Sequence, residues 1–203
     1  PDGVVRTPEE LVRRMLARPC GGATHIAAGL RRGHEELARG RDPGCEGSAH
    51  EALLEVAAGL SPRVEDAASH LAFADVSGMD RLFPDERDLA HEAGRLARHL
   101  DLPVRIGIAA TKLAARLAAQ QPDPPTVVPA GAEADFLAPL PIDLLGLEPR
   151  LQATLARWGV ATLGDLARLP ADRVAGRLGD AGARAHEAAR GLDPEPVVPH
   201  PLS

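Results

Sequence analysis

Apolar residues recur with a clear period from residue 49 onward, and the period changes along the chain. Residues 49–60 and 85–100 carry apolar side chains on one helical face, and acidic residues fill the first turn of the second segment. The short segments 61–66, 70–76 and 103–110 predict strands, and Thr111 is placed to cap a helix over 112–120. This order of elements predicts an α+β fold with helices covering a sheet.

A proline-rich bridge over residues 121–137 separates this pattern from a different one. Beyond it, five segments have helical periodicity, with Gly or Pro at the joints between them: 142–147, 148–159, 162–170, 171–179 and 183–191. We therefore predict an α+β unit over 49–128, a small all-helical unit over 129–195 and a proline-rich tail over 196–203. The bridge predicts units that proteolysis separates, and Trp158 should be buried near Leu155 and Leu166.

The first 48 residues are weakly patterned. Thr7 and Pro8 open a short capped helix over 7–16, and the Gly- and Arg-rich stretch 18–47 predicts loops and at most one short helix. We expect a divergent or poorly ordered N-terminal segment with no strand.

Composition limits the functions that this chain can serve. The net charge is −6, aromatic residues make up 2% and Tyr is absent, so neither strong electrostatic attraction to nucleic acid nor base stacking is expected. Cys20 and Cys45 lack metal-ligand spacing, and the scattered histidines, His186 among them, are expected at the surface. With no signal peptide and no apolar run that could span a bilayer, we expect a cytoplasmic protein without membrane contact.

The most specific local pattern is the segment Leu145–Pro149, a tight hairpin between two predicted helices. Such a hairpin in a helix-hairpin-helix module presents backbone amides to a phosphate, and Leu145, Gly146, Leu147 and Arg150 are the candidate DNA contacts. Glu148 opposes this function because its carboxylate repels a phosphate. A plain helical hairpin that packs its own core explains the pattern equally well.

Several quoted stretches together resemble the Y-family translesion DNA polymerases, from the palm through the thumb. They are ALLEVAAGLSPRVEDAASHLAFADVSGMDRLF, RIGIAATKLAARLAA, VVPAGAEADFLAPLPIDLL and RWGVATLGDLARLPADRVAGRLGDAGARAHEAARGLDPEPV, in that order. The resemblance covers about residues 49–198 and is closest to the non-catalytic ImuB-like branch of UmuC-type proteins. It implies a palm-like sheet followed by a helical thumb.

The resemblance also implies where the catalytic residues would stand. The family's adjacent Asp-Glu pair falls on His70 and Leu71, and a later strand Asp falls on Asp75. Imidazole and an alkyl group are poor Mg²⁺ ligands, so we expect no metal and no cofactor. Asp75 is either a vestigial carboxylate of the family's site or an Asp that caps the turn after its strand. Lys112 and Arg116 fall on a helix that faces phosphates in the family, although a solvated helix face is the alternative.

These observations favour a catalytically inactive polymerase-like protein that serves DNA repair as a scaffold or DNA-binding accessory. Weak, sequence-independent DNA binding is expected, and the resemblance implies a polymerase subunit, a sliding clamp or SOS accessory proteins as partners. A weakly active translesion polymerase using Glu65, Asp66 and Asp75 with Mg²⁺, or an inert fragment of a longer homologue, are the alternatives.

Overall fold

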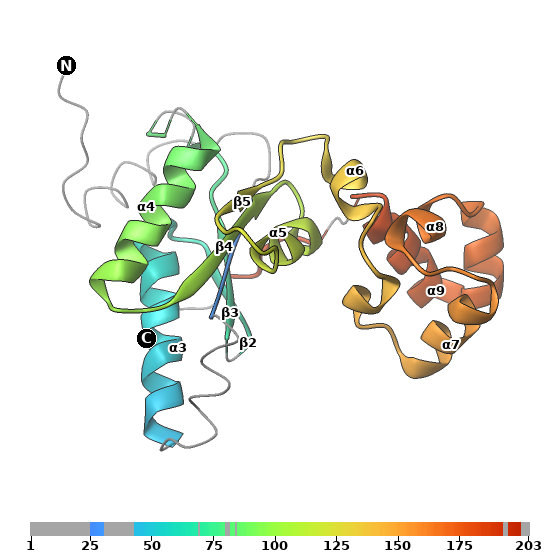
Figure 1. Cartoon of the computed structure of the whole chain (residues 1–203), viewed down its shortest axis with the longest axis horizontal. Helices are drawn as coiled ribbons and strands as arrows, with labels where there is room; N and C mark the ends of the chain where they lie inside the picture. Colours follow the sequence, from blue (N-terminus) through green and yellow to red (C-terminus); the bar gives the residue numbers. More distant parts are fainter. Residues whose placement is uncertain are drawn as a thin grey trace.

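The computed structural model describes residues 25–30, 43–68, 70–79, 82–83, 85–192 and 195–199. Two units lie side by side, a sheet unit and a smaller helical unit, with α5 between the sheet and the helices (Figure 1). The predicted helix over 7–16 lies outside the described residues. Within the described residues, no helix is long and apolar enough to cross a membrane.

Within the described ranges, the sheet unit contains five strands in the order β2-β3-β1-β4-β5. They are β1 (His25–Leu30), β2 (Val64–Ala68), β3 (Leu71–Asp75), β4 (Val104–Ala109) and β5 (Thr126–Val127). β1 pairs antiparallel with β3 and β4, β2 pairs antiparallel with β3, and β5 runs parallel to β4. The predicted strands over 70–76 and 103–110 are confirmed. The strand predicted over 61–66 is present but displaced toward the C-terminus, since β2 begins at Val64 and ends at Ala68.

The central strand β1 corrects the expectation that residues 1–48 contain no strand. β1 has neighbours on both sides, so its sequence does not need the alternation of apolar and polar residues that marks a half-exposed strand. Its composition, HIAAGL, also includes residues with weak strand preference. The following helix α3 (Pro43–Leu60) begins six residues before the predicted start at Ala49.

The two faces of the sheet pack against different helices, because successive side chains of a strand point to opposite faces. Ala72, Ala74, Ile106 and Ile108 belong to one core with α3 and α4 (Glu86–His99). Phe73 and Ala109 belong to a second core with α5 (Lys112–Ala119). Thr111 caps α5 as predicted, accepting a hydrogen bond from the backbone N–H of Ala114.

The proline-rich bridge is anchored to the sheet unit. β5 lies within it, and α6 (Glu133–Leu137) follows. Glu133 is buried and accepts hydrogen bonds from the backbone N–H groups of Ala110, at 3.3 Å, and Gly131, at 2.8 Å. The second core continues across the predicted boundary at 128/129 from α5 to Leu137, Leu155 and Leu166.

The helical unit contains the 3-10 helix η2 (Ile142–Leu145) and the helices α7 (Pro149–Arg157), α8 (Leu163–Ala167) and α9 (Ala171–Ala189). The predicted cap of α8 is confirmed as a reciprocal pair, since Thr162 and Asp165 each accept the other's backbone N–H. The two predicted segments 171–179 and 183–191 are one element interrupted at Gly179, whose φ is 65°.

Two predictions about the helical unit are wrong. Trp158 is 38% exposed, because α7 ends at Arg157 and Trp158 occupies the cap position outside the buried stripe of the helix. His186 is buried, and its Nε2 lies 2.9 Å from the carbonyl oxygen of Leu169. Leu155, by contrast, is fully buried as the helical period predicts.

Candidate nucleic-acid groove

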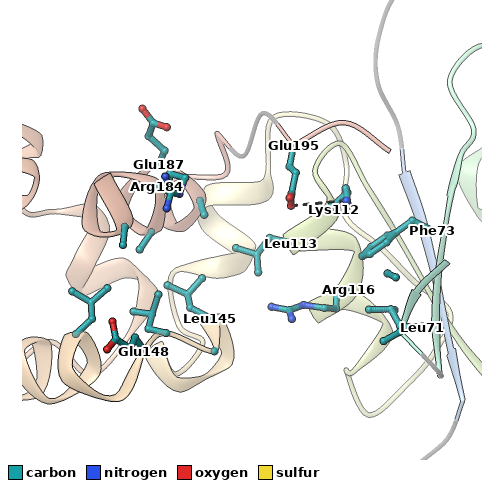
Figure 2. A pocket seen from close by; sticks show the side chains of 18 of the residues that line it. Leu71, Phe73, Lys112, Leu113, Arg116, Leu145, Glu148, Arg184, Glu187 and Glu195 are labelled. Carbon is teal, nitrogen blue, oxygen red and sulfur yellow. Dashed lines mark ion pairs between the residues drawn. The ribbon is translucent and has the colours of Figure 1, made fainter. Parts of the chain in front are cut away.

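An open groove of about 830 Å³ lies between the sheet unit and the helical unit (Figure 2). Both units contribute to its lining. From the sheet unit come Glu65, Leu71, Phe73, Lys112, Leu113 and Arg116; from the helical unit come Leu145, Gly146, Leu147, Glu148, Leu151, Arg184 and Glu187, together with Glu195 beyond α9. Five of the six predicted DNA contacts therefore line one groove. The sixth, Arg150, is exposed on α7 and lies outside this lining.

Lys112 is buried at the sheet side of the groove. Its Nζ donates hydrogen bonds to both carboxylate oxygens of Glu65, at 2.7 and 2.9 Å, and lies 5.1 Å from the centre of the Phe73 ring. A carboxylate and an aromatic face both stabilise a buried ammonium group. The predicted alternative of a solvated helix face is therefore wrong for Lys112.

Arg116 lies one helical turn further along α5 and connects the sheet unit to the hairpin. Its Nη2 donates a hydrogen bond of 3.0 Å to the carbonyl oxygen of Leu144, in the last turn of η2. This bond fixes the hairpin against α5 and so helps to set the width of the groove at this point.

The hairpin itself depends on a left-handed glycine. Gly146 has φ 62° and ψ 35°, a conformation that side-chain-bearing residues rarely adopt, and Pro149 opens α7 at its first position. Glu148 precedes α7 without a side-chain capping bond and faces the groove. The left-handed turn and the predicted two helices are present, and a phosphate-binding role for the hairpin stays a prediction.

Asp75 serves the turn that follows its strand. One carboxylate oxygen accepts a 2.9 Å hydrogen bond from the backbone N–H of Ser77, and the other lies 2.8 Å from Nη2 of Arg63. Both contacts are local to the end of β3, away from the lining of the groove. Of the two interpretations of Asp75, the structure supports the turn cap.

The three carboxylates of the alternative polymerase site do not converge. Glu65 and Asp66 are neighbours on β2 and point to opposite faces, where Glu65 meets Lys112 and Asp66 lies 3.1 Å from Nε2 of His50. Asp75 pairs with Arg63. The described residues contain no group of three His, Cys, Asp or Glu side chains that could hold a metal ion.

His70 and Leu71 stand at the start of β3. Leu71 of β3 pairs with Gly29 of the central strand β1. Neither residue of this pair has a carboxylate that could bind a metal ion. Leu71 lines the groove beside Phe73, whereas His70 is exposed. The groove wall at this point is apolar.

The charge of the groove is nearly balanced. Among the described residues that line it, four carboxylates, Glu65, Glu148, Glu187 and Glu195, face three cations, Lys112, Arg116 and Arg184. Lys112 is paired with Glu65, and Arg116 donates a hydrogen bond to the Leu144 carbonyl oxygen. Attraction of a polyanion by this surface is therefore weak.

The sequence patterns do not predict the roles of four groove residues, Glu65, Arg184, Glu187 and Glu195. The sequence suggests Glu65 only as a metal ligand, although it is the partner of the single lysine of the chain. Arg184 and Glu187 lie three residues apart on α9 and share its groove-facing side with Ala181, Ala185 and Ala188. The helical spacing of the alanines beside these charged residues is a sequence pattern that indicates one face of α9. No pattern around Glu195 indicates that it contacts the groove.

Comparison with known proteins agrees with this architecture. Residues 39–120 match the impB/mucB/samB family. DinB from Sulfolobus solfataricus has the same fold, with a TM-score of 0.67 and 16% identity over 86% of this chain and 69% of that one. An insertion ternary complex of Dbh DNA polymerase matches with a TM-score of 0.66 and 15% identity, and it covers the same shares of the two chains.

Sequence relatives make the class more specific. DNA polymerase IV 2 of Mesorhizobium japonicum is 39% identical over 135 residues, which are 64% of this chain and 32% of that protein. DNA polymerase IV of Moorella thermoacetica is 33% identical over 154 residues, 74% of this chain and 38% of that protein. The chain thus spans about a third of the length of the curated relatives it matches. Its sequence is similar to these DNA polymerase IV proteins, and residues 39–120 match the impB/mucB/samB family.

Proposed function

We propose that this chain is the palm-and-thumb part of a DNA-polymerase-IV-like protein and that it contacts duplex DNA through the groove between its two units. The observation that carries the proposal is the groove itself, which brings Lys112, Arg116 and the hairpin residues Leu145–Leu147 together from segments far apart in sequence. The relatives' names and the Dbh ternary complexes support a role in handling DNA. Translesion synthesis and DNA repair are the processes to which such a part belongs.

Binding at this groove is weak, independent of base sequence and sensitive to salt. The nearly balanced lining allows only a few phosphates to be neutralised, and each neutralised phosphate releases counterions into solution. Exposed aromatic platforms for base stacking are scarce, since Phe73 is buried and Trp158 lies outside the lining.

We further propose that the chain does not itself extend a primer. His70 and Leu71 occupy the positions implied for the acidic pair. Glu65, Asp66 and Asp75 each contact a different side chain, which are Lys112, His50 and Arg63 in that order. Two-metal nucleotidyl transfer needs carboxylates that bring two ions to within about 4 Å of each other. A scaffold or DNA-binding accessory, as in the ImuB-like branch, fits this chemistry, with a polymerase subunit, a sliding clamp or SOS accessory proteins as partners.

A second function, weak translesion polymerisation, is favoured by one observation, the name DNA polymerase IV carried by the sequence relatives. A primer-extension assay of the purified chain with Mg²⁺ or Mn²⁺ separates the two functions. No extension is expected from the accessory. Template-dependent incorporation that Glu65→Gln or Asp66→Asn abolishes would establish the polymerase and overturn the accessory role.

The DNA groove is tested by binding of a fluorescent primer–template duplex at several salt concentrations. Glu148→Gln should tighten binding about twofold to fivefold at low salt, because it removes one repelling carboxylate from the groove. Glu51→Gln removes the same charge from an exposed position of α3, across the sheet unit from the groove, and should change binding less. Equal effects of the two variants would contradict a site in the groove.

A further inference from the structure

Residues Glu195–Pro199, here called the strap, follow the helical unit and return across the groove to the sheet unit. Figure 2 shows Glu195 above Lys112 at the groove, with its carboxylate directed at the ammonium group. The strap thus connects the far end of the helical unit to β2 and α5. Its contacts carry an inference about how the groove is regulated.

Contacts with the sheet unit and the second core hold the strap in place. The backbone N–H of Val198 donates a 2.7 Å hydrogen bond to Oε2 of Glu65. The Glu195 carboxylate lies 3.9 Å from Nζ of Lys112, and Val197 packs against the second core. Glu65 is therefore shared, since the same carboxylate binds the lysine of α5 and the strap.

The strap meets Lys112 in the way that a phosphate group would. A carboxylate and a phosphate oxygen are alternative anionic partners for an ammonium group. Lys112 is only 7% exposed with the strap in place, so an anionic ligand in the groove and the Glu195 carboxylate compete for the same cation.

The strap is also held weakly enough to be released. Val198 is 56% exposed and the Glu195 side chain is 69% exposed, so these residues bury little surface to offset the conformational entropy lost when the segment is ordered. A segment whose small buried surface barely offsets its loss of conformational entropy opens more readily than the core elements on either side of it.

We propose that the strap is an autoinhibitory element that covers Lys112 and withholds it from anionic ligands, so that DNA engages the sheet side of the groove only after the strap is released. The identity of the ligand as DNA rests on the proposed function. The proposal that the strap covers Lys112 rests on the contacts of the strap and is independent of the proposed function.

The test uses the fact that Lys112 is the only lysine of the chain. An amine-directed acylating reagent therefore reports the accessibility of Lys112, and peptide mass spectrometry separates it from the N-terminal amine. The full chain is labelled without DNA. Val198→Pro removes the N–H that binds Glu65 without changing any charge, and it should raise the labelling rate of Lys112 about fivefold to tenfold.

Two further variants make the result decisive. Glu195→Gln removes the carboxylate beside Lys112 and should also raise the labelling rate of Lys112. If the circular dichroism spectrum shows that Val198→Pro does not fold like the parent, the Glu195→Gln variant decides the test. Glu187→Gln removes a carboxylate that lines the same groove from α9 and points away from Lys112 in Figure 2, and it should leave the rate at the parent's value. An unchanged rate in the folded strap variants would overturn the proposal.

Adding primer–template DNA separates the strap from the proposed function. If DNA binds in the groove, it should protect Lys112 from labelling more strongly in Val198→Pro than in the parent, and its affinity should rise several-fold. If the strap variants are labelled faster but DNA neither binds nor protects Lys112 at low salt, the proposal that the strap covers Lys112 stands. The proposal that DNA binds in the groove is then overturned.

Discussion

On the side of the sheet that faces α3 and α4, the core is built largely from branched aliphatic side chains such as Leu53, Ile106 and Ile108. On the side that faces α5, alanines and a glycine predominate, among them Gly107, Ala115 and Ala118. A Cβ atom at Gly107 would lie 2.2 Å from the carbonyl oxygen of Ala115, so α5 and β4 touch backbone to backbone. The small residues thus bring α5 close to the sheet, and α5 carries the two cations of the sheet unit that line the groove.

The first core is confined to the sheet unit, whereas the second continues into the helical unit. Leu113 and Leu117 of α5 belong to the same buried cluster as Leu137, Leu155 and Leu163. The groove therefore lies over a continuous core, although the proline-rich bridge suggests two separable parts. The difference in extent between the two cores shows that α5 packs against both the sheet and the helical unit.

The largest effect is expected at the close contact between α5 and β4. Gly107→Ala should lower the free energy of unfolding by more than about 3 kcal/mol, because backbone atoms of α5 would have to move. Gly94→Ala is the matched control on the opposite face, where the added Cβ meets the Arg98 side chain at 3.3 Å and Ile106 at 3.8 Å. It should be nearly neutral or stabilising by up to about 1 kcal/mol. Urea unfolding measures both, and equal losses would contradict the contrast between the faces.

The next effect concerns coupling between the units. Leu53→Ala should destabilise the sheet unit by about 3 kcal/mol, because it empties a fully buried position of the first core. Trp158, the single tryptophan, lies in the helical unit and reports its unfolding by fluorescence. The fluorescence midpoint in urea should shift together with the circular dichroism midpoint. A fluorescence midpoint that stays at the parent's value would show that the second core does not join the units.

A smaller loss is expected from breaking the Lys112–Glu65 pair. Lys112→Met should cost about 2 kcal/mol, because Glu65 then keeps a largely buried charge without its main partner. The double variant Lys112→Met with Glu65→Leu should recover most of that loss. Thermal unfolding of the three proteins tests this, and a double variant less stable than both single ones would show that the pair is a net source of stability.

The smallest effect is at the cap of α8, far from both sheet faces. Hydrogen bonds from the backbone N–H groups of Thr162 and Ala161 hold the pKa of Asp165 below its usual value of 3.8. A carboxyl with a lowered pKa in the folded state stabilises the fold above pH 3.8 and loses that contribution as the pH falls through the folded-state pKa. Asp165→Asn should therefore lower stability at pH 7 and leave it closer to the parent's at pH 3. Equal losses at both pH values would contradict the role of the charge.

Local patterns predicted most of the elements but not the environment of single side chains. The strand 103–110, the Thr111 cap and the Thr162–Asp165 cap are set by residues close in sequence, and the structure confirms them. The central strand β1 was missed because a strand paired on both sides has no alternating pattern. The exposure of Trp158 and the burial of His186 depend on where α7 ends and on which helices pack together.

The groove shows the same limit. The hairpin could be selected from sequence because the Gly-Pro signal of its turn is local. Lys112 and Arg116 could be selected because their segment resembles a helix that faces phosphates in the Y family, and they stand one helical turn apart. The pairing of Lys112 with Glu65 joins residues 47 positions apart, and the contact of Val198 with Glu65 joins residues 133 apart. Contacts over such separations are created by the packing of α5, the sheet and the strap, and no periodicity reports them.

The most direct test of the account is the salt dependence of binding to a primer–template duplex, measured for the parent, Arg184→Ala and Arg173→Ala. Arg184 lines the groove, whereas Arg173 is an exposed arginine of the same helix outside it. The slope of log K against log salt concentration should become shallower by about 0.9 in Arg184→Ala, the value for one lost phosphate contact. Arg173→Ala should keep the parent's slope. An unchanged slope in Arg184→Ala, with a shallower one in Arg173→Ala, would contradict DNA binding in the groove.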